Sequence, residues 1–371
     1  MVFTTHPSYN QTKSRAASIP ALCGSAPSQL VCGADSQCGD SYSCAASSCS
    51  CTSANPSTNN AFFDINYGTG SAAGSMYSGA LGLPGATNYQ SMPVVFGCDL
   101  KTSGLYDSQN SGVFGLNYQP ASMYSQMAAR GLITRQLSFC LGSGQAGNEA
   151  EAGFLILGDS TVKGLAAHKQ YAIKRLKTTA RTGPYSNAFF DGLWVELLSV
   201  QFPGGGGADF VAGNRLTPVA LFDTGTSLTY LPPTALAAVV KALSAYAAKS
   251  SLIVSQAVGQ FQAFPNAISF TATRVLTRQQ LDSIWPPLLF TFPSFNGTGR
   301  TTVPISFSSS ILYLANSNSG QPVYLNTMQD SGDDGQAILG NTWTEHILLQ
   351  SDQVAQTITL TPLTSCGDVT F

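Results

Sequence analysis

The sequence predicts a mostly β protein made of two related lobes. Short apolar runs bounded by glycine and other turn residues recur along the chain, which is typical of strands. Only three segments read as helices, and all are short or modest in length. A weak internal echo relates Gly112-Val-Phe-Gly-Leu116 to Ala337-Ile-Leu-Gly-Asn341, and repetition of this kind suggests two related halves. The length of 371 residues fits about two domains.

In the first half, residues 1–60 read as irregular and Cys-rich. Residues 61–67 and 72–83 predict two strands joined by Gly68-Thr-Gly-Ser71, a glycine-containing turn suited to a hairpin. Residues 122–131 predict a helix with Ser122 as its N-cap and Gly131 beyond its end. Further strands are predicted at 92–98, 112–116, 139–141 and 153–158.

In the second half, the Ala-rich segment 233–249 predicts the clearest helix, because Pro233 stands in its first turn. Residues 278–284 predict another short helix. The remaining apolar runs predict strands near 170–177, 188–202, 218–223, 287–292, 303–307, 311–315, 337–339, 346–350 and 356–360.

The charge content narrows the function classes. The chain has 17 Lys and Arg against 19 Asp and Glu, which is 10% of its residues, whereas globular proteins have about 25%. A net charge of −2 excludes a strongly basic nucleic-acid binder and argues against a polybasic membrane-surface protein. No apolar run approaches the roughly 20 residues that span a bilayer. We therefore expect no nucleic-acid partner and no membrane span.

Nine cysteines indicate an oxidising compartment, and six of them lie within residues 23–51. Their spacing is irregular and no histidine lies nearby, so disulfides are favoured over the paired ligands of a zinc site. The odd count requires an explanation: a free thiol, an intermolecular disulfide or a missing piece of chain. The sequons Asn10-Gln-Thr12 and Asn296-Gly-Thr298 fit a secreted glycoprotein, yet residues 1–7 have no signal-peptide pattern.

The sharpest motif is Asp223-Thr-Gly-Thr226, which lies between two apolar runs. The Gly225 amide and the Thr226 hydroxyl can both donate to the Asp223 carboxylate, and Thr224 is small enough to point inward. A plain β-turn uses the same residue types and is the simpler interpretation of the bare triplet. Apolar strands on both sides favour a buried functional turn, because a solvated turn does not need them.

With these residues, the chain resembles pepsin-like aspartic proteases, in particular the plant and algal nepenthesin-type branch. The resemblance follows nearly the whole chain and depends on several segments: the catalytic loop Phe222–Ser227, the flap segment Asn66–Ser71, the apolar-apolar-Gly segments 112–116 and 338–340, the Cys-dense region 23–51, and Cys140 with Cys366, which stand where the branch often has a bridge.

The resemblance implies a bilobal pepsin-like acid protease fold. Residues 1–172 would form the N-terminal lobe, with the Cys-rich insert 23–51 and the flap 62–83, and residues 173–371 the C-terminal lobe. Asp223 would be catalytic, Thr224, Gly225 and Thr226 would support it, and Tyr67, Gly68 and Thr69 of the flap would contact substrate. The implied protein is a monomer of the secretory pathway, extracellular or vacuolar, that cleaves polypeptides and uses no metal and no other cofactor.

The family places one aspartate in each lobe, and here the first is not found. Asp35 and Asp40 lie among cysteines, and Asp64 lies within the flap strand. Residues 3–22 resemble the family's segment some two dozen residues after its first catalytic loop. We therefore expect the first lobe to be incomplete at its N-terminus, with little or no peptidase activity in the chain as written.

A second reading keeps the same fold without the enzyme: a catalytically inactive pepsin-like binding or inhibitor protein. A one-motif homodimer is disfavoured by length. Two further features receive the plainer interpretation. Trp194, Trp285 and Trp343 are expected to pack in the core, and Asp330, Asp333 and Asp334 to form a solvated turn and not a calcium site.

Overall fold

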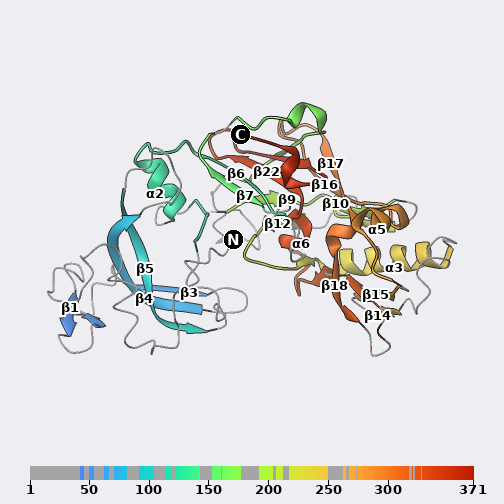
Figure 1. The fold of residues 1–371 in the computed structure, drawn as a ribbon, viewed down its shortest axis with the longest axis horizontal. Coiled ribbons are helices and arrows are strands. Elements are labelled where there is room, and N and C mark those ends of the chain that lie inside the picture. Colours follow the sequence, from blue (N-terminus) through green and yellow to red (C-terminus); the bar gives the residue numbers. More distant parts are fainter. Residues whose placement is uncertain are drawn as a thin grey trace. The chain divides into compact units, whose positions relative to one another are not determined.

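The computed structural model divides into two compact units, Met1–Ala129 and Arg130–Phe371, here called unit 1 and unit 2 (Figure 1). It is mostly β, as predicted. The residues that the structure describes are 42–45, 50–53, 62–66, 71–81, 92–103, 114–118, 122–142, 153–159, 161–176, 192–203, 206–211, 217–249, 262–264, 267–272, 274–316, 320, 322–326 and 328–371.

Unit 1 contains the predicted hairpin. Strands β3 (Phe62–Asn66) and β4 (Ser71–Leu81) pair antiparallel with Asn66 opposite Ser71, and β5 (Met92–Ser103) pairs with β4. The turn between β3 and β4 lies outside the described residues. Within the stretch expected to be irregular, β1 (Tyr42–Ala45) and β2 (Ser50–Ser53) form a further short hairpin.

Helix α2 (Met123–Ala129) has the predicted ends. The Ser122 hydroxyl accepts from the Ser125 N–H at 3.2 Å, which satisfies one of the free donors of the first turn. Gly131 follows the helix with a φ of 69°, the left-handed conformation that glycine adopts without penalty. The strand predicted at 112–116 is not formed in its described part, because residues 114–116 have no regular structure.

Unit 2 holds a five-stranded sheet that joins distant parts of the chain. Its order is β7 (Phe154–Leu157), β6 (Gln136–Cys140), β22 (Ile347–Asp352), β23 (Thr357–Pro362) and β8 (Tyr171–Lys174). Residues assigned from sequence to the N-terminal lobe thus pair with C-terminal strands, and the predicted boundary at 172/173 lies within β8. A disulfide between Cys140 and Cys366, both buried, crosslinks the same regions.

Three more sheets complete the described part of unit 2. The first has the order β20 (Met328–Asp330), β13 (Thr229–Leu231), β21 (Gln336–Leu339), β12 (Val219–Phe222) and β9 (Trp194–Glu196). The second has the order β11 (Gly206–Asp209), β10 (Ser199–Phe202), β16 (Leu288–Pro293) and β17 (Arg300–Ile305). The third has the order β14 (Gln262–Phe264), β15 (Ala267–Thr271), β19 (Pro322–Asn326) and β18 (Ile311–Asn316).

The described part of unit 2 holds few helices. They are α3 (Pro233–Lys249), α5 (Arg278–Ile284), α6 (Asn341–Thr344) and the 3-10 turns η4 (Leu165–Ala167), η5 (Phe307–Ser310) and η6 (Cys366–Asp368). The predicted bounds of α3 and α5 are confirmed. No helix within the described ranges is both long and apolar enough to cross a membrane.

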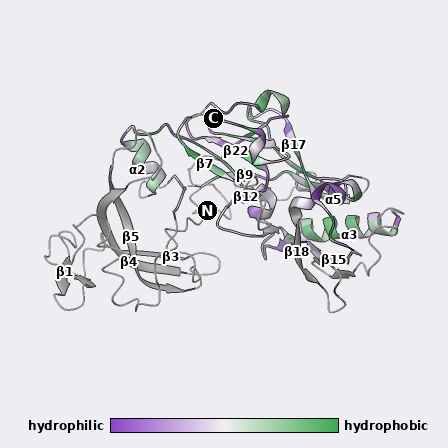
Figure 2. Cartoon of the chain, in the orientation of Figure 1, coloured by the Kyte–Doolittle hydropathy of each residue, from purple (hydrophilic) through white to green (hydrophobic). Residues whose placement is uncertain are grey.

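Helix α3 packs its apolar residues, which stand out in Figure 2, against β10 and β11. Helix and strand approach so closely that a Cβ on Gly206 would lie 2.7 Å from the Cβ of Ala242. The carboxylate of Asp334 accepts from the N–H and the hydroxyl of Thr234 at 3.1 and 2.8 Å. A negative group is favourable at this end of a helix, so Asp334 caps α3 from another part of the chain.

Candidate active site

The sequence around Asp223 folds as a strand that ends in a tight turn. Strand β12 is largely buried and lies between β21, to which it is parallel, and β9. The pairing of Phe222 with Leu339 carries the chain to the edge of the sheet, and the Asp223 N–H donates to the Leu339 carbonyl at 3.1 Å. Asp223 is half-buried at this edge. The sheet therefore fixes the backbone from which the carboxylate projects.

Both carboxylate oxygens of Asp223 accept hydrogen bonds from its own turn. The Gly225 N–H donates to Oδ1 at 2.9 Å, and the Thr226 hydroxyl donates to Oδ2 at 2.6 Å. The Thr226 N–H also donates to the Asp223 carbonyl at 3.2 Å. Hydrogen bonds to an ionised acceptor are short and strong, so the two donors orient the carboxylate. These are the two contacts that the sequence predicted.

Gly225 allows the backbone of the turn to lie close to the Asp223 carboxylate. A Cβ added to it would lie 3.1 Å from Asp223 Oδ1, inside ordinary contact distance. A larger residue would displace the carboxylate or its donor.

A second segment of chain passes behind the turn. A Cβ on Gly340 would lie 2.1 Å from the Leu228 carbonyl oxygen and 2.5 Å from that of Thr226, which no side chain can tolerate. Beyond Gly340, the Asn341 N–H donates to the Thr226 carbonyl at 2.8 Å and the Thr342 N–H to the Ser227 carbonyl at 3.1 Å. The apolar-apolar-Gly segment 338–340 thus buttresses the Asp223 turn by backbone contact, and glycine is required for it.

An aromatic cluster fills the space beneath the turn. The Phe222 ring lies 5.2 Å from Trp343 and 6.2 Å from Phe292, and Phe290 lies 5.4 Å from Trp343 in an edge-to-face arrangement. All four rings are buried. Trp285, also buried, stacks on Phe307, and Trp194 is half-buried. The prediction that Trp285 and Trp343 belong to the core is confirmed.

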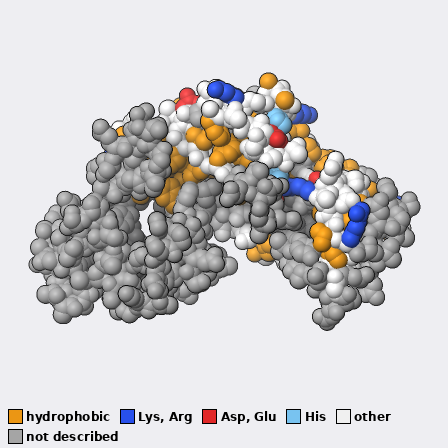
Figure 3. Space-filling model, viewed as in Figure 1, with side chains coloured by type: hydrophobic (Ala, Val, Ile, Leu, Met, Phe, Trp, Pro, Cys, Tyr) orange, Lys and Arg blue, Asp and Glu red, His pale blue; other side chains and the backbone are white. Residues whose placement is uncertain are grey.

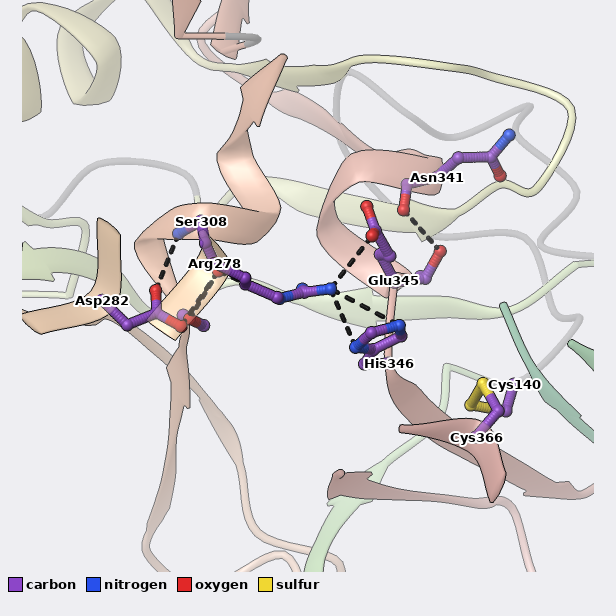
Figure 4. Close-up of polar contacts among 10 residues, drawn as sticks. Cys140, Arg278, Asp282, Ser308, Asn341, Glu345, His346 and Cys366 are labelled. Carbon is purple, nitrogen blue, oxygen red and sulfur yellow. Dashed lines mark hydrogen bonds and ion pairs between the residues drawn. A yellow bond between two sulfur atoms is a disulfide. The ribbon is translucent and has the colours of Figure 1, made fainter. Parts of the chain in front are cut away.

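A polar network holds the chain immediately after α6 (Figure 4). Nη1 of Arg278 donates to Glu345 Oε1 at 3.0 Å and to His346 Nδ1 at 2.8 Å. The same Nη1 lies 3.4 Å from His346 Nε2, and since arginine can only donate, the imidazole ring is the acceptor. Nε of Arg278 donates to Ser308, whose N–H and hydroxyl both donate to Asp282. Sequence reasoning missed this network, because Arg278 and His346 lie 68 residues apart.

His346 also has an unusual backbone. It is buried and its φ is 56°, which non-glycine residues adopt infrequently. Arg278 thus contacts His346 where the chain leaves α6. The network anchors the segment that buttresses the Asp223 turn.

The chain holds one Asp-Ser-Gly triplet, Asp330-Ser-Gly332, whose residue types resemble those of the Asp223 turn. Strand β20 ends at Asp330, which is paired with Leu231 of β13. Because β13 runs antiparallel to β21 and β12 runs parallel to it, Asp330 lies at the opposite edge of the sheet from Asp223. Asp330 is exposed and accepts from the Gly332 N–H at 2.7 Å, which makes the triplet a surface turn.

The remaining predicted site residues divide in two. Thr224 lies in the turn and is half-buried, whereas Tyr67, Gly68 and Thr69 lie outside the described residues. Asp64 lies inside β3, within a ladder, as expected for a strand residue. Within the described ranges, no cluster of three or more His, Cys, Asp or Glu side chains could hold a metal ion.

A comparison with known protein families adds an independent observation. Residues 8–159, which are less than half of the chain, match the family model described as xylanase inhibitor N-terminal. The match covers the Cys-rich region and the β3–β4 hairpin of unit 1 and ends in unit 2 just after β7. Residues 8–159 therefore carry a domain of the pepsin-like aspartic protease family, which includes catalytically inactive inhibitors.

Proposed function

We propose that this protein is an aspartic endopeptidase of the nepenthesin type, in which Asp223 is one of two catalytic carboxylates. The observation that carries the proposal is the Asp223 turn. Its carboxylate is oriented by two donors at 2.9 and 2.6 Å, and its backbone is buttressed by the glycine crossing at 340. A solvated surface turn such as 330–332 has no such buttress among the described residues.

The chemistry requires a second carboxylate beside Asp223. Two carboxyl groups a few Å apart do not both ionise readily, so they share a proton and titrate as a pair. The ionised member takes a proton from a water molecule that attacks the scissile carbonyl, and the protonated member donates to the carbonyl oxygen. Asp223 supplies one member, and Gly225 and Thr226 hold it in place. The second carboxylate would come from a first loop ahead of the flap hairpin.

The β3–β4 hairpin would act as the flap. Its strands end at Asn66 and begin again at Ser71, and Tyr67, Gly68 and Thr69 lie between these two residues in the sequence. Closure of such a hairpin over an extended polypeptide would exclude water from the reacting groups.

The same proposal implies a cellular location and an oligomeric state. The Cys140–Cys366 disulfide and the matched domain support passage through the secretory pathway, to the extracellular space or a vacuole. The described residues on the face shown in Figure 3 include few charged side chains, so protonation of carboxylates at acid pH would add little self-repulsion there. The protein would act as a monomer on polypeptide substrates.

A second candidate is a catalytically inactive binding or inhibitor protein on the same scaffold. The description of the matched family, xylanase inhibitor N-terminal, favours it. The chain also holds a single Asp-Thr-Gly triplet. An inhibitor would bind a target enzyme without needing a carboxylate pair. Its affinity would therefore not depend on the ionisation or the identity of residue 223.

The two candidates differ in a direct assay. The 371-residue chain is incubated at acid pH with an unfolded protein substrate and, separately, with xylanases whose rates are followed. The enzyme proposal predicts no xylanase inhibition, and weak or no cleavage unless the first catalytic loop is supplied by in-frame upstream sequence. Stoichiometric xylanase inhibition that survives Asp223→Asn would instead establish the binding function.

A further inference from the structure

The β16–β17 hairpin has a feature that the proposed catalysis does not use. The two strands pair up to Pro293 and Arg300, and the tip between them contains Asn296-Gly297-Thr298. Asn-X-Thr is the acceptor pattern for N-linked glycosylation. All residues from Phe295 to Arg300 are exposed. We propose that Asn296 carries an N-linked glycan at the tip of this hairpin.

Backbone hydrogen bonds close the tip of the hairpin. The Gly297 N–H donates to the Ser294 carbonyl at 2.9 Å, and the Ser294 N–H donates to the Gly299 carbonyl at 3.2 Å. Gly297 and Gly299 have φ values of 74° and 103°, which glycine adopts far more readily than other residues. The tip is therefore closed on itself by backbone contacts.

The orientation of the Asn296 amide follows from its contact with Thr298. The Thr298 N–H donates to Asn296 Oδ1 at 3.1 Å, and a backbone N–H can only be accepted by the amide oxygen. Nδ2, the atom that a glycan would occupy, is thus on the other side of the carboxamide. The turn itself needs Oδ1 and not Nδ2, so it persists when Nδ2 is substituted.

The folded hairpin has room for the modification. A glycan is bulky and strongly hydrated, so it fits only where its attachment point faces solvent. Backbone contacts tie the base of the tip to β8: the Phe295 N–H donates to the Ala172 carbonyl at 3.2 Å, and Ser294 forms a β-bridge with Ile173. Neither contact involves Asn296. The Phe295 side chain beside it is 47% exposed.

The reaction requires a sugar donor that the secretory pathway supplies. Nδ2 of Asn296 forms a bond to C1 of the first sugar of a lipid-pyrophosphate oligosaccharide. The bond between C1 and the pyrophosphate oxygen breaks, the lipid pyrophosphate leaves with that electron pair, and one amide proton is lost to a base of the transferring enzyme. The inference rests on the proposed passage through this pathway.

The test uses the full 371-residue chain behind a cleavable signal peptide in a eukaryotic secreting host. Because the added signal delivers every molecule to the compartment, the result does not depend on the chain's own targeting. The background variant Asn10→Gln removes the other sequon. Glycan on residue 296 is measured by peptide mass after enzymatic release in heavy-oxygen water, which marks each glycosylated asparagine.

Thr298 offers a matched pair of variants. Thr298→Ala destroys the acceptor pattern but keeps the N–H that donates to Asn296, whereas Thr298→Ser keeps both. We expect the parent and Thr298→Ser to carry the glycan and Thr298→Ala to lose it. Removal of the glycan without denaturation is also expected, because the tip is exposed. Unmodified Asn296 in the parent chain, or a glycan that persists in Thr298→Ala, would overturn the proposal.

Discussion

The Thr226 hydroxyl donates a 2.6 Å hydrogen bond to Oδ2 of Asp223, across a turn of four residues. The opposite oxygen accepts from the Gly225 N–H. One donor is a side chain and the other is backbone, so mutation can remove the first and leave the second in place.

Thr226→Ala tests the side-chain donor. A hydrogen bond to a charged group contributes about 1.5–3 kcal/mol, which corresponds to a loss of about 10- to 100-fold in kcat/KM if the bond acts in the transition state. Thr226→Ser keeps the hydroxyl and is expected to retain most activity. The measurement is kcat/KM for peptide cleavage by a chain supplied with its first catalytic loop. Equal kcat/KM values for Thr226→Ala and Thr226→Ser would show that the Thr226 hydroxyl does not contribute to catalysis.

Gly340→Ala tests the backbone crossing. The added Cβ would lie 2.1 Å from the Leu228 carbonyl oxygen, so the turn or the crossing segment has to move. We expect a loss of about 1–3 kcal/mol in the free energy of unfolding, as for other overpacked sites. Gly115→Ala is the control, because Gly115 is exposed and nothing lies within 4 Å of a Cβ added to it. Gly332→Ala would not serve, because Gly332 has a φ of 74°, which strains any other residue. Urea unfolding of both variants makes the comparison, and equal midpoints would contradict the predicted clash.

The Cys140–Cys366 disulfide closes a separation of 226 residues. Loss of such a crosslink releases chain entropy in the unfolded state and typically costs about 2–5 kcal/mol. The double variant Cys140→Ala, Cys366→Ala is expected to unfold at lower urea concentration than the parent. Under reducing conditions the two midpoints should approach one another. A variant as stable as the oxidised parent would show that the bridge adds nothing to the fold.

The ionisation of Asp352 is expected to make the free energy of unfolding depend on pH. Burial raises the pKa of Asp352, but hydrogen bonds from the Ala355 N–H, the Gln136 amide and the Val354 N–H outweigh it and hold the pKa below its ordinary value of 3.8. A carboxylate whose pKa is lowered by folding stabilises the native state above its unfolded pKa, and loses this effect as pH falls through the folded value.

Asp352→Asn should therefore destabilise the protein at neutral pH, and the difference should shrink as the pH falls below about 4. Urea unfolding of parent and variant across this range gives the measurement. Asp159, an exposed carboxylate just after β7, provides a control through Asp159→Asn. A gap between Asp352→Asn and the parent that stays constant with pH would contradict the assignment.

The sequence predicted local structure best where local chemistry decides it. The ends of α2 and α3 depend on Ser122, Gly131 and Pro233, and these residues act within one helical turn. The donors to Asp223 were predicted for the same reason, because Gly225 and Thr226 lie two and three residues away. Strands β19 and β20 were not predicted, since their formation depends on pairing with distant partners.

The sequence did not predict how segments far apart in the chain are placed relative to one another. Asp330-Ser-Gly332 and Asp223-Thr-Gly225 have similar letters, yet opposite strand directions place them at opposite edges of one sheet. The need for glycine at 340 arises from the Leu228 carbonyl, more than one hundred residues away. The contact of Arg278 with His346 likewise exists only in the folded chain.

The central claim is that Asp223 is a catalytic carboxylate. It is tested most directly by peptide cleavage at acid pH, in a chain extended by in-frame upstream sequence or by the first-loop segment of an active pepsin-like protease, with and without Asp223→Asn. We predict robust cleavage by the extended chain, little or none by the 371-residue chain, and loss of cleavage in Asp223→Asn with unfolding unchanged. Cleavage that survives Asp223→Asn, or robust cleavage by the 371-residue chain alone, would contradict the account.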